Sequence, residues 1–213
     1  MSLKCLVDSD FYCNFTAEVN RKSLLKCLTV LCLFFNAPVS NKVPTGVCNV
    51  QGLYEYITTN PRLRELTEQV RSVADDKQEY RRRKLAWLPY VTPAGVFSYC
   101  KGSGLLVPSG LLVVDIDHLA SLKEAEDCRD RLAADPMLNP DLAFVSPGGR
   151  GVKLFLSYRI MPEETLSQTF GNAVQAAWSY LELQYGLQPD KANKDLCRGC
   201  LLAYDEEAKK MKN

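Results

Sequence analysis

The apolar segment Leu111–Asp117 constrains the fold more than any other part of this sequence. Its sequence is LLVVDID, and apolar residues at helical spacing follow it from Leu119 to Leu132. A short apolar run rich in leucine and valine favours a buried strand, and a period of three to four residues favours an amphipathic helix. The helical pattern stops at Asp135-Pro136, where proline ends it. The sequence therefore predicts a strand followed by a helix at the centre of the fold.

A second pair of strands is predicted directly after this helix. Leu142–Val145 and Val152–Tyr158 are both apolar, and the glycine-rich segment Ser146–Gly151 joins them. A short connection of this kind predicts a β-hairpin. A helix opened by Pro162 and stopped by Gly186 follows, because proline favours the first turn of a helix and glycine favours the residue after its end.

The rest of the chain contains shorter patterns of both kinds, so the predicted fold class is mixed α+β (α/β). Residues 1–27 have no clear period and are left as an unassigned lead-in, with the domain placed at 28–213. Glycine, proline and serine predict turns over 102–110. The remaining predicted strands are Leu28–Phe35, Leu88–Val91, Gly95–Tyr99 and Cys200–Tyr204, and the remaining predicted helices cover 50–59 and a segment from Pro61.

Length and charge fit one ordinary globular domain. The chain has 213 residues, of which 46% are hydrophobic and 24% charged, which excludes disordered, collagen-like and coiled-coil classes. The net charge is only +1, but residues 1–109 hold 14 Lys+Arg and 9 Asp+Glu, whereas 110–213 hold 12 and 16. The two halves therefore carry +5 and −4. A basic half beside an acidic half suits a polyanion bound next to a carboxylate site.

Cysteine usage and hydropathy predict a cytoplasmic protein that does not enter a membrane. The nine cysteines are an odd number and their spacing indicates no disulfide framework. The apolar run Leu24–Phe35 starts too late for a signal peptide and is too short to cross a bilayer. Cys197 and Cys200 form a lone CxxC, and zinc would need two more ligands that the single His118 and the scattered cysteines do not obviously supply.

Two acidic residues close the central strand. Because side chains alternate along a strand, Asp115 and Asp117 share one face, about 6.7 Å apart along the strand. Their mutual repulsion favours a cation, and oxygen ligands suit Mg²⁺ or Mn²⁺. The alternative is a capping pair for the next helix. A second DxD, at Asp8 and Asp10, lies in the unpatterned lead-in.

The glycine-rich hairpin offers a second functional motif. Its sequence SPGGRGVK combines backbone N–H groups at Gly148 and Gly149 with the Ser146 hydroxyl and the cations Arg150 and Lys153. That set of groups suits a nucleoside triphosphate. The motif is not a Walker A loop, because the lysine lies inside a strand instead of at a helix start. The alternative is a glycine hairpin with solvated charges.

Two further sets of charges complete the candidate site. Asp205 follows the apolar segment LLAY, so three acids at strand ends form the set of groups used in two-metal nucleotidyl transfer. We predict that the three acids converge in one sheet. The run Arg81, Arg82, Arg83 and Lys84 suits contacts with nucleic-acid phosphates, or else is a solvated helix end.

These motifs together resemble a known group of proteins. DID at 115–117, SPGGRGVK at 146–153 and the segment from Arg198 into LAYD at 202–205 look like the three motifs, in order, of primase-polymerases of the archaeo-eukaryotic primase superfamily. The similarity is greatest to the VirE N-terminal, primase-polymerase-like domains of bacterial mobile elements. It extends upstream through LPYVTPAGVF in the segment 84–97.

The resemblance implies an RRM-like catalytic sheet with a smaller N-terminal α/β unit, two divalent metals (Mg²⁺ or Mn²⁺), and template-directed nucleotide polymerisation. Asp115, Asp117 and Asp205 would hold metal, and Ser146, Arg150 and Lys153 would hold the incoming triphosphate. Many superfamily members have histidine where this chain has Lys153. His118 follows the acidic pair on what should be the opposite strand face, so we do not assign it that role.

Three functions remain open at this stage. The first is a metal-dependent nucleotidyltransferase that acts in replication of DNA, as in a mobile element. Its partners would be a single-stranded template and nucleoside triphosphates, with a helicase domain or protein as a further candidate partner. The second is a non-catalytic nucleic-acid-binding module for replication or mobilisation on the same fold. The third is another metal-dependent phosphotransferase or a nuclease that uses the same acids.

Overall fold

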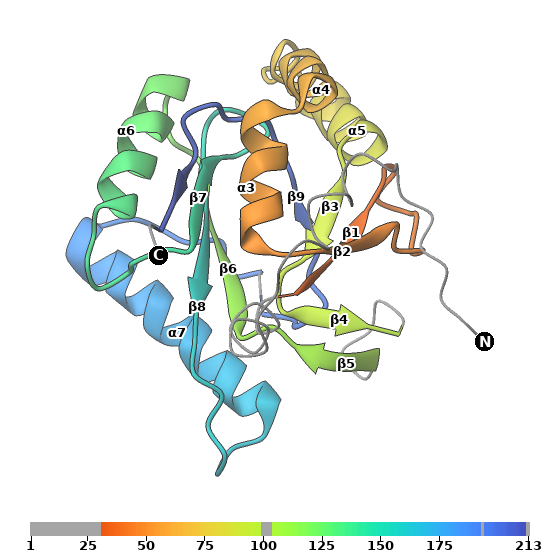
Figure 1. The fold of residues 1–213 in the computed structure, drawn as a ribbon. Coiled ribbons are helices and arrows are strands. Elements are labelled where there is room, and N and C mark those ends of the chain that lie inside the picture. The colour runs from red at the N-terminus through yellow and green to blue at the C-terminus, as the bar shows by residue number, and fades with distance from the viewer. Residues whose placement is uncertain (1–30, 99–103, 193, 212–213) are drawn as a thin grey trace, which may run out of the picture.

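A computed structural model describes residues 31–98, 104–192 and 194–211, in which helices pack against antiparallel sheets (Figure 1). The mixed α+β fold class predicted from the sequence is confirmed. The strands of the described residues are β1 Cys32–Phe35, β2 Gly46–Cys48, β3 Tyr90–Thr92, β4 Gly95–Phe97, β5 Leu105–Pro108, β6 Leu111–Ile116, β7 Leu142–Val145, β8 Val152–Ser157, β9 Cys200–Leu201 and β10 Lys209–Lys210. The helices are α3 Val50–Thr59, α4 Pro61–Arg71, α5 Lys77–Trp87, α6 Leu122–Ala133 and α7 Leu166–Tyr185.

The predicted central strand is β6, at one edge of a four-stranded sheet with the order β10-β7-β8-β6. The segment β6-α6-β7-β8 forms a split βαβ unit, because β8 lies between β6 and β7 and runs antiparallel to both. In the register of β6 and β8, Asp115 lies directly opposite Lys153. This pairing joins the first two predicted motifs.

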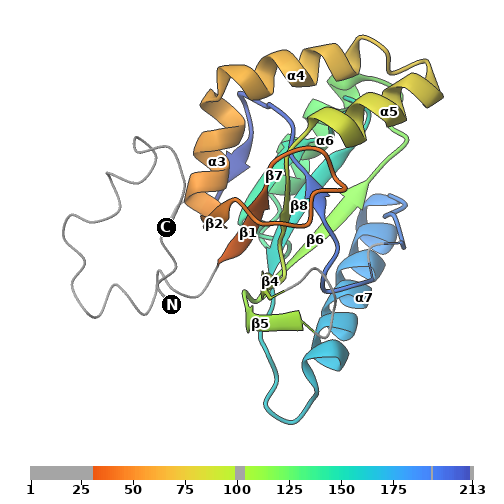
Figure 2. The same cartoon turned by 90° about the vertical axis from the view of Figure 1, so that its right-hand side faces the viewer.

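Both faces of this sheet are buried, and alternate side chains of β6 point to opposite faces. Leu112 and Val114 pack with α6 and α7, whereas Leu111 and Val113 pack with α3 and the other four-stranded sheet, whose order is β2-β1-β3-β9. Figures 1 and 2 show α6 and α7 on one side of the β6 sheet and α3 on the other. By the same alternation Asp115 faces the space between the two sheets.

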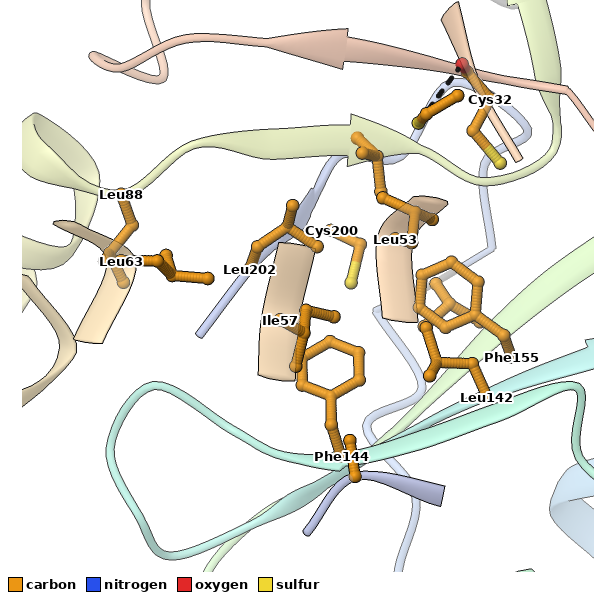
Figure 3. Close-up of a cluster of buried hydrophobic side chains, with 14 of the residues drawn as sticks. Cys32, Leu53, Ile57, Leu63, Leu88, Leu142, Phe144, Phe155, Cys200 and Leu202 are labelled. Atoms are coloured by element: carbon orange, nitrogen blue, oxygen red, sulfur yellow. Dashed lines mark hydrogen bonds between the residues drawn. The ribbon is translucent and has the colours of Figure 1, made fainter. Parts of the chain in front are cut away.

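Apolar side chains from both sheets and from α3 fill the space between the sheets. Leu53 and Ile57 of α3 are buried beside Phe144 and Phe155 of the β6 sheet, and Cys200 of β9 joins the same cluster (Figure 3). The helices begin where side chains satisfy free backbone N–H groups, as when the Asn60 side chain accepts from Leu63 N. Helices α4 and α5 lie together at one end of the molecule, above this core (Figure 2).

The structure corrects several predicted boundaries. A strand, β5, occupies part of the predicted turn region, where it pairs with β4. Helix α7 begins at Leu166 and not at Pro162, because Thr165 and Gln168 form a capping box. The predicted strand from Cys200 to Tyr204 ends at Leu201. The short strand β10, formed by two lysines, was not predicted, since charged residues give no strand signal.

Two other expectations concern the ends of the chain and membranes. The lead-in 1–27 and its pair Asp8 and Asp10 lie outside the described residues. Among the residues that are described, no helix combines the length and apolar character needed to cross a membrane.

Candidate functional site

A pocket of about 260 Å³ lies where three distant parts of the chain meet. Helix α5, the end of β6 and the turn between β7 and β8 each contribute to its wall. Two of the predicted motifs thus converge here with one member of the basic run. The pocket is lined by Ala74 before α5, Tyr80 and Lys84 of α5, Asp117 and His118 after β6, and Ser146, Gly148 and Arg150 of the turn.

The acidic pair, Asp115 and Asp117, lies at one side of this pocket with different partners. Lys153 Nζ donates to Asp115 Oδ1 at 2.6 Å, and both side chains are largely buried. Asp117 opens to the pocket. Desolvation by the surrounding protein atoms and the neighbouring Asp115 carboxylate raise the pKa of Asp117. The Asp117 carboxylate therefore responds to the charge of Asp115.

The glycine turn, residues 146–151, approaches both α5 and the acidic pair. Ser146 N–H donates to Gly151 O at 2.8 Å, and Gly149 has a φ of 71°, which favours glycine. A Cβ on Gly151 would lie 2.4 Å from the Ile116 carbonyl oxygen and 2.8 Å from Asp117 Oδ1. Only glycine lets the turn pass this close to the end of β6.

Lys153 is not part of the pocket wall. Its side chain is 10% exposed and its ammonium bonds to Asp115. The carboxylates of Asp115 and Asp117 keep the pKa of Lys153 raised in spite of burial, which by itself lowers it. The lysine predicted to hold the triphosphate thus has a carboxylate as its partner.

The basic run divides into three environments. Arg82 and Arg83 both donate to Glu79, with Nε–oxygen distances of 2.6 Å, and these bonds hold the pKa of Glu79 at about 2. Arg81 is exposed. Lys84 alone of the four lines the pocket. The four charges therefore do not form one continuous phosphate-binding stripe.

Asp205 has a buried ion pair of its own. Arg129 Nη1 donates to Asp205 Oδ1 at 2.6 Å, and Val145 N–H donates to Asp205 Oδ2 at 2.8 Å. The strand before Asp205, β9, belongs to the other four-stranded sheet, so the prediction that the three acids end strands of one sheet is wrong. Over the residues that the structure describes, no group of three or more His, Cys, Asp or Glu side chains is arranged to hold a metal ion.

Sequence reasoning missed Arg129 as the partner of Asp205, although a signal was present. The buried positions of α6 are Ala125, Cys128, Arg129 and Leu132, which follow the i, i+3, i+4, i+7 spacing of a core face. An arginine at such a position needs a buried acid. The sequence alone does not say which acid it meets.

His118 also differs from expectation. Strand alternation predicts it on the face opposite Asp117, but β6 ends at Ile116 and His118 has a φ of 66°. This left-handed conformation turns the chain, so His118 and Asp117 line the same pocket. Strand alternation fails here because the residue lies beyond the strand.

The lone CxxC shows no sign of a reactive site. Cys200 is buried in the core, and burial raises its pKa to about 12, so its thiol stays protonated. Cys32, Cys48 and Cys128 are likewise buried and form no disulfide among the described residues.

Comparison with known proteins identifies a family. The family model described as BT4734-like, N-terminal domain matches residues 83–209, from Arg83 of α5 to the first residue of β10. Comparisons with curated proteins and with solved structures found no match. The family match includes the acidic pair, the glycine turn and Asp205. Since it spans more than half of the 213 residues, the chain belongs to the BT4734-like, N-terminal domain family.

Proposed function

We propose that this protein is a metal-dependent nucleotidyltransferase of the primase-polymerase type that acts in replication of DNA, as in a mobile element. The observation that supports this proposal is the pocket in which Asp117, Ser146 and Arg150 meet. Its partners would be a single-stranded template and nucleoside triphosphates, with a helicase domain or protein as a further partner. Buried free cysteines suit a reducing cytoplasm as the location.

The pocket has the chemistry expected of a triphosphate site. The glycine turn brings main chain without side chains to the pocket at Gly148, and Ser146 adds a hydroxyl. Arg150 also lines the pocket while it bonds to Asp75 at 2.9 Å, in an ion pair that is exposed to solvent. An exposed pair of this kind contributes little, so a phosphate can compete for the guanidinium.

The acidic pair would hold one divalent cation through Asp117 and the second oxygen of Asp115, because Lys153 already contacts Asp115 Oδ1. Burial and the Asp115 carboxylate raise the pKa of Asp117, so a bound cation would favour its ionised form. Asp205 does not fit as a third ligand, because Arg129 and Val145 N–H hold its two oxygens. Mg²⁺ or Mn²⁺ bound to the acidic pair would lower the pKa of an attacking hydroxyl and neutralise phosphate charge.

The chain's own groups would then hold the reactants. Lys153 fixes the Asp115 carboxylate by a buried bond of 2.6 Å, which leaves Asp117 to face the pocket. The glycine turn and Arg150 would orient the triphosphate toward Asp117. Holding the reactants in line supplies much of the catalysis in phosphoryl transfer, for which a protein does little covalent chemistry.

An extension assay tests the proposal. The protein is incubated with a single-stranded DNA template, labelled deoxynucleotides and Mn²⁺ or Mg²⁺, and products are separated by length. We expect extension by the parent, none by the double variant Asp115→Asn, Asp117→Asn, and parental extension by Glu206→Gln, an exposed acid outside the pocket. A parent that extends nothing across primed and unprimed templates would contradict the proposal.

A non-catalytic nucleic-acid-binding module is the second candidate. The specific observation in its favour is that two of the three predicted metal ligands, Asp115 and Asp205, are already neutralised by Lys153 and Arg129. Such a module would bind single strands with strong salt dependence. Its affinity would not change in the double aspartate variant, and it would incorporate no nucleotide.

A further inference from the structure

Two lysines lie close to the acidic pair, and their ammonium groups differ in what they contact. Lys153 comes from β8 and its Nζ lies 2.6 Å from Asp115 Oδ1. Lys84 comes from α5 and lines the pocket wall. The pKa of Lys84 is affected most by burial and then by the nearby charges of Lys153, Asp117 and Asp115. Of these two lysines, Lys153 alone has a carboxylate within ion-pair distance among the described residues.

The Lys84 ammonium lacks an acceptor. Among the residues that the structure describes, no carboxylate or carbonyl oxygen forms an ion pair or hydrogen bond with Lys84 Nζ. The side chain is half-buried, and burial together with Lys153 lowers its pKa. An ammonium has three N–H donors, and without a protein acceptor those of Lys84 are available to a ligand in the pocket. An anion in the pocket would supply the missing acceptors.

Tyr80 fixes the position of this lysine. It lies one helical turn before Lys84, and Lys84 Nζ lies 4.7 Å from the centre of the Tyr80 ring. The Tyr80 hydroxyl packs against Gly148, where a Cβ would lie only 2.7 Å from it. Tyr80 thus links the ammonium of α5 to the turn that offers backbone N–H groups.

We propose that Lys84, held by the ring of Tyr80, binds the phosphate groups of the pocket's ligand, and that Lys153 does not. The ligand class is a polyphosphate ester such as a nucleoside triphosphate. This inference rests on the proposed function, because it names the phosphate-binding lysine of the same pocket. It moves Lys84 from the nucleic-acid contact predicted for the basic run to the nucleotide site.

Binding of inorganic tripolyphosphate, measured by titration calorimetry in EDTA, tests the assignment without activity or added metal. Lys84→Met should weaken binding at least 10-fold, the usual loss for a charge-assisted contact. Arg81→Met is the matched control: it removes the same charge from the same helix, at an exposed residue outside the pocket, and should change the affinity less than twofold. Thermal denaturation verifies that each variant is folded.

Tyr80 acts through Lys84, so its test must separate positioning of the ammonium from a general structural role. Tyr80→Phe keeps the ring under the ammonium and should keep the parental affinity, whereas Tyr80→Leu should weaken binding about three- to tenfold. Equal affinity of Lys84→Met and parent, or equal losses in Lys84→Met and Arg81→Met, would overturn the assignment.

The two proposals fail in different assays. A parent that does not bind tripolyphosphate would overturn the role of Lys84, while the extension assay separately decides whether the protein is a nucleotidyltransferase. Unchanged tripolyphosphate binding combined with an equal loss of single-strand affinity in Lys84→Met and Arg81→Met would return Lys84 to the nucleic-acid surface and overturn the assignment as well.

Discussion

Arg129 of α6 and Asp205 form an ion pair of 2.6 Å although their side chains are only 3% and 7% exposed. The second oxygen of Asp205 accepts the Val145 N–H, so this pair joins α6 and β7 to the segment after β9. A buried pair contributes little compared with apolar side chains of the same size, but removal of one partner leaves an uncompensated charge.

We therefore predict that Arg129→Met lowers the free energy of unfolding by about 3–5 kcal/mol. Lys123→Met, which breaks an exposed pair with Asp127 on the same helix, should change it by less than about 0.5 kcal/mol. Urea denaturation followed by circular dichroism measures both. If the two variants lose equal stability, the buried pair does not join these elements as described.

The raised pKa of Asp117 predicts a dependence of stability on pH. Because the folded protein holds this proton more tightly than the unfolded chain does, ionisation of Asp117 destabilises the fold. The cost is fully present above the raised pKa and disappears as the pH falls below the unfolded value of about 3.9. Asp117→Asn in EDTA should thus raise the free energy of unfolding at pH 7 by up to about 1 kcal/mol, since solvent screens the pair, and should have no effect at pH 3.

Glu206→Gln controls for the loss of one negative charge, because Glu206 is exposed. Its stability should follow that of the parent at both pH values. An Asp117→Asn protein that is less stable than the parent at pH 7 would show that this carboxylate is stabilised, not strained, by its surroundings.

We predict that substitution by alanine has opposite effects on stability at two glycines. Gly151→Ala should destabilise by about 1–3 kcal/mol, because the new methyl would lie 2.4 Å from a backbone oxygen that cannot move away. Gly171 lies inside α7 with nothing within 4 Å of the added Cβ, so Gly171→Ala should stabilise by about 0.5–1 kcal/mol. Thermal denaturation of the two variants against the parent gives the signs.

Because Glu79 holds Arg82 and Arg83, we predict that removal of its charge increases nucleic-acid binding. Glu79→Gln removes the charge that retains Arg82 and Arg83, so both become free for phosphates. The log–log salt slope for single-stranded DNA should steepen by up to about 1.4, at about 0.7 for each new phosphate contact. Fluorescence anisotropy at several salt concentrations measures the slope.

Glu163→Gln makes the same change of charge at an exposed residue before α7. An equal increase in both variants would reflect the net charge of the protein alone. No increase in either would mean that α5 does not follow a nucleic-acid backbone.

Elements with an uninterrupted pattern could be predicted from the sequence. The predicted helix over 50–59 and the strand Leu142–Val145 agree with the structure at both ends, because caps and apolar spacing are local signals. The hairpin after Val145 is also confirmed. Local signals failed at β10 and β5, where pairing with a distant or neighbouring strand decides the conformation.

The sequence predicted which residues form the candidate site better than it predicted the partners of those residues. Asp117, Ser146, Gly148 and Arg150 meet in one pocket, but the contacts of Lys153 and Asp205 depend on which element packs against each. Strand register sets Lys153 opposite Asp115, and the packing of α6 brings Arg129 to Asp205. Neither register nor helix packing can be obtained from one sequence without a pairing signal.

The sheet with the order β2-β1-β3-β9 combines strands from the start, middle and end of the described chain, since Leu33 pairs with Thr92 and Val91 pairs with Cys200. During synthesis β3 leaves the ribosome long before β9, so one edge of this sheet stays open while the rest of the chain emerges. Open strand edges invite association with other chains. Because such long-range pairings also slow folding, nascent chains that stop short of residue 200 should be clients of chaperones and prone to aggregate.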